Sequence, residues 1–153
     1  MNFETKTETK TEANVQQAVP FLMVTNMDAS LRFYMEGLGF AMKNKWIDEG
    51  KLRWCWLEIG AAAIMLQEYR AERVPMEKLS VDVSTCFQCK DAIALYREFT
   101  SRGIQAKEPF VGNGMWVTTL RDPDGHVLDF ESLTGVPIPE ETKLSEWKAQ
   151  TAK

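Results

Sequence analysis

The hydrophobic positions of this chain follow the same order twice. A strand-like apolar run at 21–24 leads into a helical pattern of about three turns that ends at a glycine. A second strand-like run at 85–89 leads into another helical pattern that also ends at a glycine. Three large side chains form one stripe on each predicted helix: Leu31, Tyr34 and Leu38 on the first, and Ile93, Tyr96 and Phe99 on the second. The pattern predicts an internal repeat.

More strand-like sequence follows each helix, at 51–59 and 62–68 in the first half and at 115–120 and 126–131 in the second. The residues Asp-Pro-Asp-Gly at 122–125 are typical of a tight turn, because proline presets φ and glycine accepts a positive φ. Each half is therefore predicted to be a β-α-β-β-β module. The modules span about 19–69 and about 81–131. We expect an α+β fold in which the two tandem modules form a shared concave sheet.

The ends of the chain differ from this central domain, which we place at 18–135. Residues 1–17 contain a polar, charge-balanced near-repeat of Glu, Thr and Lys, which predicts a flexible arm. Residues 136–153 predict a C-terminal helical extension. Pro139 and the glutamates after it suit a helix start, and Leu144 and Trp147 share one face of that helix.

Composition and charge exclude several classes of partner. The 153 residues are 44% hydrophobic and 26% charged, which is typical of a folded domain. A net charge of -4 argues against a nucleic-acid binder, which needs a basic face. The chain contains no apolar run of membrane-spanning length, and its first residues lack the order of a secretory signal. We therefore expect a cytoplasmic protein with neither nucleic acid nor membrane as partner.

The three cysteines do not suggest a metal or redox site. An odd number this small favours reduced thiols. Cys86 and Cys89 have Cys-x-x-Cys spacing, but residues three apart on a strand point to opposite faces, and there is no second pair to complete a zinc site. Cys55 alternates with polar and aromatic neighbours and is expected to be a buried, unreactive thiol.

Three segments carry a resemblance to a known family: 28–40, 102–104 and 121–126. With the strands between them, the chain resembles the vicinal oxygen chelate superfamily over about 19–131. That superfamily contains glyoxalases, bleomycin-resistance proteins and extradiol dioxygenases. The resemblance implies two sheets around a pocket and a homodimer whose pockets are built across sheets of both modules. It does not by itself confer a reaction.

The resemblance also implies where a divalent metal would bind. The family's four ligand positions fall on Val19, Met65, Ser84 and Asp129 in this chain. Valine cannot ligate, a thioether is too soft for a hard ion, and serine is rarely a ligand, so only Asp129 is suitable. We therefore predict no metal and no cofactor. The chain is closest in character to the metal-free, bleomycin-resistance-like branch.

No catalytic residue emerges from the sequence. Asp129 and Glu131 project from one strand face, where like-charge repulsion could create a general base, although solvated strand-end carboxylates are the favoured interpretation. His126 is the one histidine, and it is interpreted as an exposed hairpin residue rather than a ligand or base. Enzymatic activity is therefore left open, with non-enzymatic binding favoured.

Aromatic residues suggest a binding surface instead. Tryptophans lining the concave side of a sheet would stack against a flat or cationic ligand. The predicted ligand-binding set is Trp54, Trp56, Trp116, Trp46, Phe110, Met65, Asp129 and Glu131. We predict sequestration of a small, partly planar drug or metabolite without metal. Two alternatives stay open. One is a divalent-metal-dependent lyase or dioxygenase with Glu68 or Glu131 as ligand, and the other is a dimeric interaction scaffold without a ligand.

Overall fold

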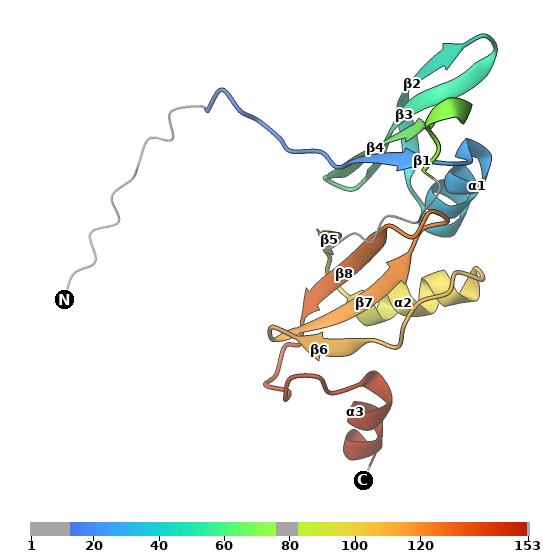
Figure 1. Ribbon diagram of the computed structural model, residues 1–153. Coiled ribbons are helices and arrows are strands. Elements are labelled where there is room, and N and C mark those ends of the chain that lie inside the picture. The colour runs from blue at the N-terminus through green and yellow to red at the C-terminus, as the bar shows by residue number, and fades with distance from the viewer. Residues whose placement is uncertain (1–12, 76–82, 153) are drawn as a thin grey trace.

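The computed structural model describes residues 13–75 and 83–152. The first module contains β1 (Phe21–Val24), α1 (Met27–Leu31), the π-helix η1 (Arg32–Gly37), β2 (Ala41–Asp48), β3 (Lys51–Ile59) and β4 (Ala62–Glu68), followed by the short 3-10 helix η2 (Ala71–Arg73). The second contains β5 (Ser84–Gln88), α2 (Ala92–Ser101), β6 (Phe110–Gly112), β7 (Met115–Arg121) and β8 (Val127–Leu133), and α3 (Leu144–Thr151) ends the chain. The two predicted β-α-β-β-β modules are confirmed (Figure 1).

The modules have the same strand topology. Sheet A has the order β1-β4-β3-β2, and sheet B has the order β5-β8-β7-β6. In both, the first strand pairs in parallel with the last, and the remaining neighbours are antiparallel. The sheets stay separate in the described part of the chain, so they do not form one continuous hydrogen-bonded sheet.

Each sheet buries one face under its helix. In the middle of β3 and β4, alternate side chains are fully buried, namely Cys55, Leu57, Ile64 and Leu66. The side chain of Asn26 accepts a hydrogen bond from the Ala29 N–H at 3.0 Å and so caps α1. Asp91 caps α2 in the same way, through the Ala94 N–H at 2.9 Å. These caps begin the two helices at equivalent places in the repeat.

Aromatic rings join the modules on their helix-covered sides. Phe40 of the first module lies 5.9 Å from Phe87 on β5, and Phe87 stacks on Phe130 at 4.8 Å. Gly37 has a packing role here, because a Cβ at this position would lie 2.6 Å from Ile104 Cδ1. The shared core therefore leaves the opposite face of each sheet open.

The C-terminal helix begins later than expected. It starts at Leu144 rather than near Pro139, because the preceding residues bond to the edge of sheet B. The Val111 N–H donates to the Thr142 carbonyl at 3.0 Å, and the Leu144 N–H donates to the Pro109 carbonyl at 2.9 Å. Leu144 is buried, as the shared face with Trp147 predicts.

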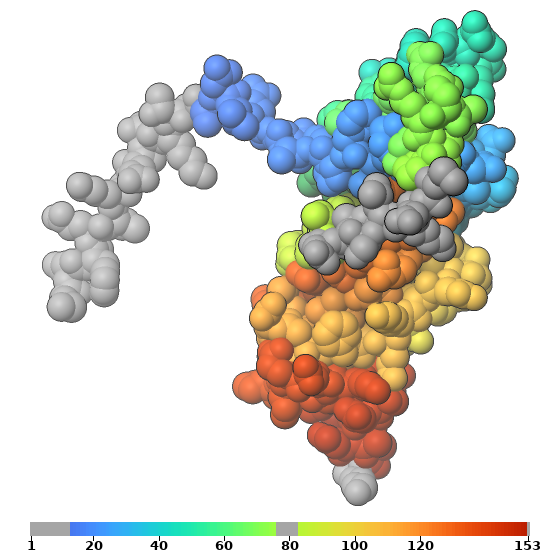
Figure 2. All heavy atoms as spheres, in the orientation of Figure 1, coloured from blue at the N-terminus to red at the C-terminus, as the bar shows by residue number. Residues whose placement is uncertain are grey.

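At the other end, residues 13–16 project away from the packed body (Figures 1 and 2). Among the described residues, none of the helices combines the length and hydrophobicity that crossing a membrane requires.

Candidate ligand-binding site

The open face of sheet A gathers the aromatic side chains of β2 and β3. Trp54 and Trp56 alternate with the buried Cys55, so both point away from α1. Trp54 pairs with Trp46 across the β2–β3 ladder, and Trp56 pairs with Met65 on β4. Four of the predicted residues therefore lie together on one face.

A fifth residue, the aromatic Phe21, which the sequence analysis did not single out, extends this surface. Phe21 on β1 is in register with Met65, so Trp56, Met65 and Phe21 form a row across the sheet. Phe21 is 51% exposed and Trp46 is 46% exposed, while Trp54, Trp56 and Met65 are half-buried. We call these five residues the aromatic face. The pairing of β1 with β4, which brings Phe21 to this surface, is a contact between distant segments, so no local sequence pattern identifies Phe21.

One polar contact fixes an indole on this surface. The Trp56 Nε1–H donates to Glu58 Oε1 at 2.8 Å. Both residues are half-buried and lie two positions apart on β3, so their side chains share the open face. The sequence analysis missed Glu58.

The open face of sheet B is polar by comparison. Asp129 and Glu131 lie on this face. Phe110 lies on it too, because Val117 on β7 is in register with both Phe110 on β6 and Glu131 on β8. Asp129 accepts a 2.6 Å hydrogen bond from the Thr119 hydroxyl. Glu131 accepts one from the Gln88 amide at 2.7 Å. Each carboxylate therefore has its own hydrogen-bond donor.

A cavity of about 760 Å³ is lined by residues of both modules. It is lined from β1 and β4 by residues including Phe21 and Ala63, and from β5 by residues including Ser84 and Cys86. Phe21 belongs both to this cavity and to the aromatic face, so the two meet at this side chain.

Trp116 does not belong to this surface, which corrects the sequence prediction. It alternates with Met115 and Val117 on β7 and points to the helix-covered side of sheet B. It is 5% exposed and packs in a core cluster with Val111 and Leu144. Position on a strand does not reveal which face a helix will cover.

The residues at the family's metal positions do not fit a divalent ion. Val19 and Ser84 line the cavity, while Met65 and Asp129 lie on the two open faces. Their side chains offer one carboxylate, a hydroxyl and a thioether, and the carboxylate already bonds Thr119. Across 13–75 and 83–152, no group of three or more His, Cys, Asp or Glu residues is arranged to hold a metal.

Glu68, the alternative metal ligand considered from the sequence, already forms other contacts. It is buried on the helix-covered side of β4, where it pairs with Lys51 and accepts the Met27 N–H at 2.9 Å. Burial alone would raise the pKa of Glu68, but these contacts and Arg53 together hold that pKa below its usual value.

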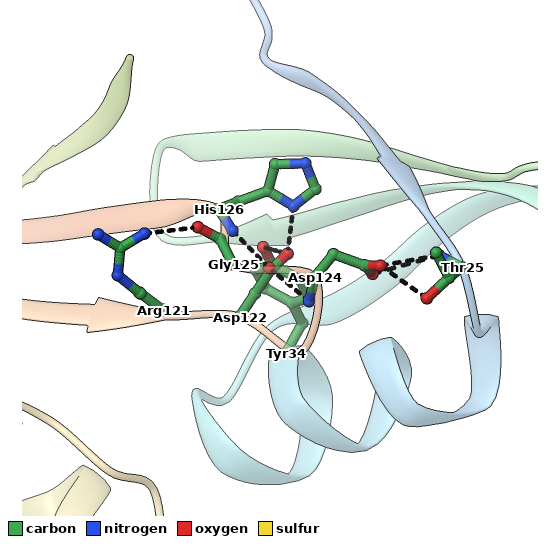
Figure 3. Close-up of polar contacts among 7 residues, drawn as sticks. All are labelled: Thr25, Tyr34, Arg121, Asp122, Asp124, Gly125 and His126. Carbon is green, nitrogen blue, oxygen red and sulfur yellow. Dashed lines mark hydrogen bonds and ion pairs between the residues drawn. The ribbon is translucent and has the colours of Figure 1, made fainter. Parts of the chain in front are cut away.

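His126 is not an exposed hairpin residue, contrary to the prediction (Figure 3). Its side chain is 22% exposed, and its Nδ1 lies 2.7 Å from Asp122 Oδ2. The same oxygen accepts the Tyr34 hydroxyl at 2.8 Å, which links the β7–β8 turn to the first module. The hydrogen bond with Asp122 raises the pKa of His126 above its usual value. Burial raises the pKa of Tyr34 beyond the physiological range, so its hydroxyl remains a donor.

The cysteines offer no activated thiol. All three are free. Burial raises the pKa of Cys55 to about 11, and burial also raises the pKa of Cys86 and Cys89. A thiol whose pKa is raised is a poor nucleophile at neutral pH.

Fold and surface together define a protein of two tandem β-α-β-β-β modules with an open aromatic sheet face beside a cavity. The sequence profile described as the Glyoxalase/Bleomycin resistance protein/Dioxygenase superfamily matches residues 15–130. The chain belongs to this superfamily.

Solved structures agree with that assignment. A bleomycin-binding protein complexed with bleomycin is 26% identical, with a TM-score of 0.61 over 77% of this chain and 98% of that one. A bleomycin resistance determinant encoded on transposon Tn5 is also 26% identical, with a TM-score of 0.62 over 78% of this chain and 99% of that one. TnmS3, an antibiotic-binding protein from Streptomyces sp. CB03234, shares the fold at 18% identity and a TM-score of 0.60, over 78% and 98% of the two chains. No curated protein matches the sequence.

Proposed function

We propose that this protein binds a small, partly planar organic molecule without metal and without chemical conversion, and so sequesters a drug or metabolite. The observation that carries the proposal is the aromatic face, where large apolar side chains lie half-buried or exposed beside a cavity. Exposed apolar surface of this kind marks binding sites. The two solved proteins at 26% identity are a bleomycin-binding and a bleomycin-resistance protein, which supports ligands of the same broad kind.

Stacking and the burial of apolar area can together supply the affinity that sequestration needs. Sequestration needs a dissociation constant of about 1 μM or lower, which corresponds to about -8 kcal/mol. Each stacked aromatic contact contributes roughly 0.5–1.5 kcal/mol beyond the burial of apolar area. Trp54 and Trp56 provide the stacking contacts, and with the cavity wall at Phe21 they provide the apolar area that a ligand would bury.

We expect truncation of either indole to weaken binding. Trp54→Ala and Trp56→Ala should each reduce the affinity for a planar probe by about tenfold, because a stacking surface and its buried area are lost. Calorimetric titration with bleomycin and with N-methylacridinium measures this without relying on tryptophan fluorescence.

The matched control is Trp147→Ala, which removes a partly buried tryptophan from the C-terminal helix, away from the aromatic face. Its affinity should equal that of the wild type. Failure of both probes to bind, or equal binding by all the variants, would overturn the proposal and favour a scaffold without a ligand.

We also propose that the protein acts as a homodimer in the cytoplasm. Exposed large apolar residues on sheet A, including Ile47 at 52%, suit a face that a second copy of the chain partly covers. Its three free cysteines suit a reducing compartment.

Light scattering after size-exclusion chromatography should give about twice the mass of the 17.5 kDa chain. The mass should be measured again as the protein is diluted from high to low micromolar concentration, to show whether the dimer persists. A mass of 17.5 kDa at every concentration would exclude the dimer and require the site to be complete within one chain.

A further inference from the structure

We propose that Glu58 makes the aromatic face selective for cations, by holding the Trp56 indole in place and by supplying the negative charge beside it. This inference rests on the proposed function and deepens it, because it specifies the charge of the ligand.

The geometry places a carboxylate at the edge of the stacking surface. Glu58 Oε1 accepts the Trp56 Nε1–H at 2.8 Å, so the carboxylate lies at the edge of the ring that carries nitrogen. A ligand stacked on the face of this indole therefore has the carboxylate close to its own rim.

The neighbours of Glu58 leave room for a ligand. Across the ladders, Glu58 is in register with Ala41 on β2 and Ala63 on β4. Both side chains are single methyl groups, in contrast to the adjacent row of Trp56 and Met65. Ala63 also lines the cavity of about 760 Å³, so the β4 neighbour of Glu58 in the ladder borders that cavity.

Within residues 13–75 and 83–152, no Lys, Arg or His side chain forms an ion pair with Glu58. Among the described residues, the ion pairs involve Glu68, Glu98 and Asp122, whereas Glu58 bonds only the neutral indole. A carboxylate without an ion-pair partner leaves an unpaired negative charge beside the indole, which attracts a positive ligand. The indole face attracts the same charge through its quadrupole. A planar ligand with an aromatic cation or a protonated amine satisfies both groups at once.

The test compares two probes of nearly the same shape. N-methylacridinium carries a permanent positive charge, and acridine is neutral at mildly alkaline pH. The wild-type protein should bind the cation about tenfold more tightly than the neutral probe. Glu58→Gln keeps an oxygen that can accept the indole N–H and removes the charge, so it should lower the affinity for the cation and bring the two affinities to within about threefold.

Glu58→Ala separates positioning from charge. It removes the bond to the indole as well, so it should also weaken acridine binding, by about threefold, and alter the near-ultraviolet circular dichroism of the tryptophans. Glu36→Gln is the matched control, because it makes the same change of charge at an exposed helical position and should keep the tenfold preference.

The outcomes distinguish this inference from the proposed function. If both probes bind the wild type and Trp56→Ala weakens both, but Glu58→Gln keeps the full preference for the cation, only the role of Glu58 is overturned. If neither probe binds the wild type, the proposed function is overturned and the selectivity of Glu58 with it.

Discussion

Replacing Asp122 with alanine is expected to lower the free energy of unfolding by about 3–5 kcal/mol, with a fall in Tm of roughly 10 °C. The side chain of Asp122 is fully buried. Its Oδ1 accepts the N–H groups of Asp124 and His126 at 3.0 and 2.8 Å, and its Oδ2 binds Tyr34 and the His126 ring. Alanine removes every acceptor, so the buried Tyr34 hydroxyl and the partly buried donors of Asp124 and His126 lose their partners. Denaturation monitored by circular dichroism measures the loss.

The exposed Asp28 in the first turn of α1 provides the matched control, and Asp28→Ala should cost less than about 1 kcal/mol. The pH dependence gives an independent measurement. Because the folded-state pKa of His126 is raised, its contribution to stability is fully present below the usual value of 6.5 and is lost as pH rises through the raised pKa. This decrease should disappear in Asp122→Ala. Equal stability of this variant and the wild type across the pH range would contradict the role of the buried carboxylate.

Replacing Phe87 with alanine should destabilise the protein by about 3–4 kcal/mol. Phe87 is 7% exposed and lies between the modules, 5.9 Å from Phe40 and stacked on Phe130 at 4.8 Å. The substitution leaves a cavity and removes two aromatic contacts from the core that the modules share. Urea denaturation measures both the loss of stability and whether unfolding stays a single transition.

Phe21→Ala is the matched control, because it makes the same substitution at a side chain that is 51% exposed. It should cost less than about 1 kcal/mol and should still weaken binding of a planar probe, since Phe21 lies on the aromatic face. If Phe87→Ala were no more destabilising than Phe21→Ala, the aromatic junction would not be what holds the modules together.

The Asp122 network also has a consequence for the binding site. Through Asp124, the same turn accepts the Thr25 N–H at 3.1 Å and the Thr25 hydroxyl at 2.7 Å, directly after β1 (Figure 3). The turn of the second module is thus bonded to the end of the strand that carries Phe21. These contacts fix the position of β1, and with it one wall of the cavity.

The sequence alone determined the features that depend on neighbouring residues. Alternation along a strand is local, so it placed Trp54 and Trp56 together and opposite Cys55. The turn at 122–125 and the repeated order of strands and helices are local for the same reason, and they were sufficient to predict the two modules.

The tertiary structure decided what depends on contacts between distant segments. Trp116 is buried because α2 and α3 cover its side of sheet B, which the alternation along β7 cannot reveal. His126 is ordered by a carboxylate that also binds Tyr34, a residue 88 positions away from Asp122. The late start of α3 depends on hydrogen bonds to β6. Local pattern thus determines which side chains share a face, whereas packing between segments determines which faces are closed and which remain open to a ligand.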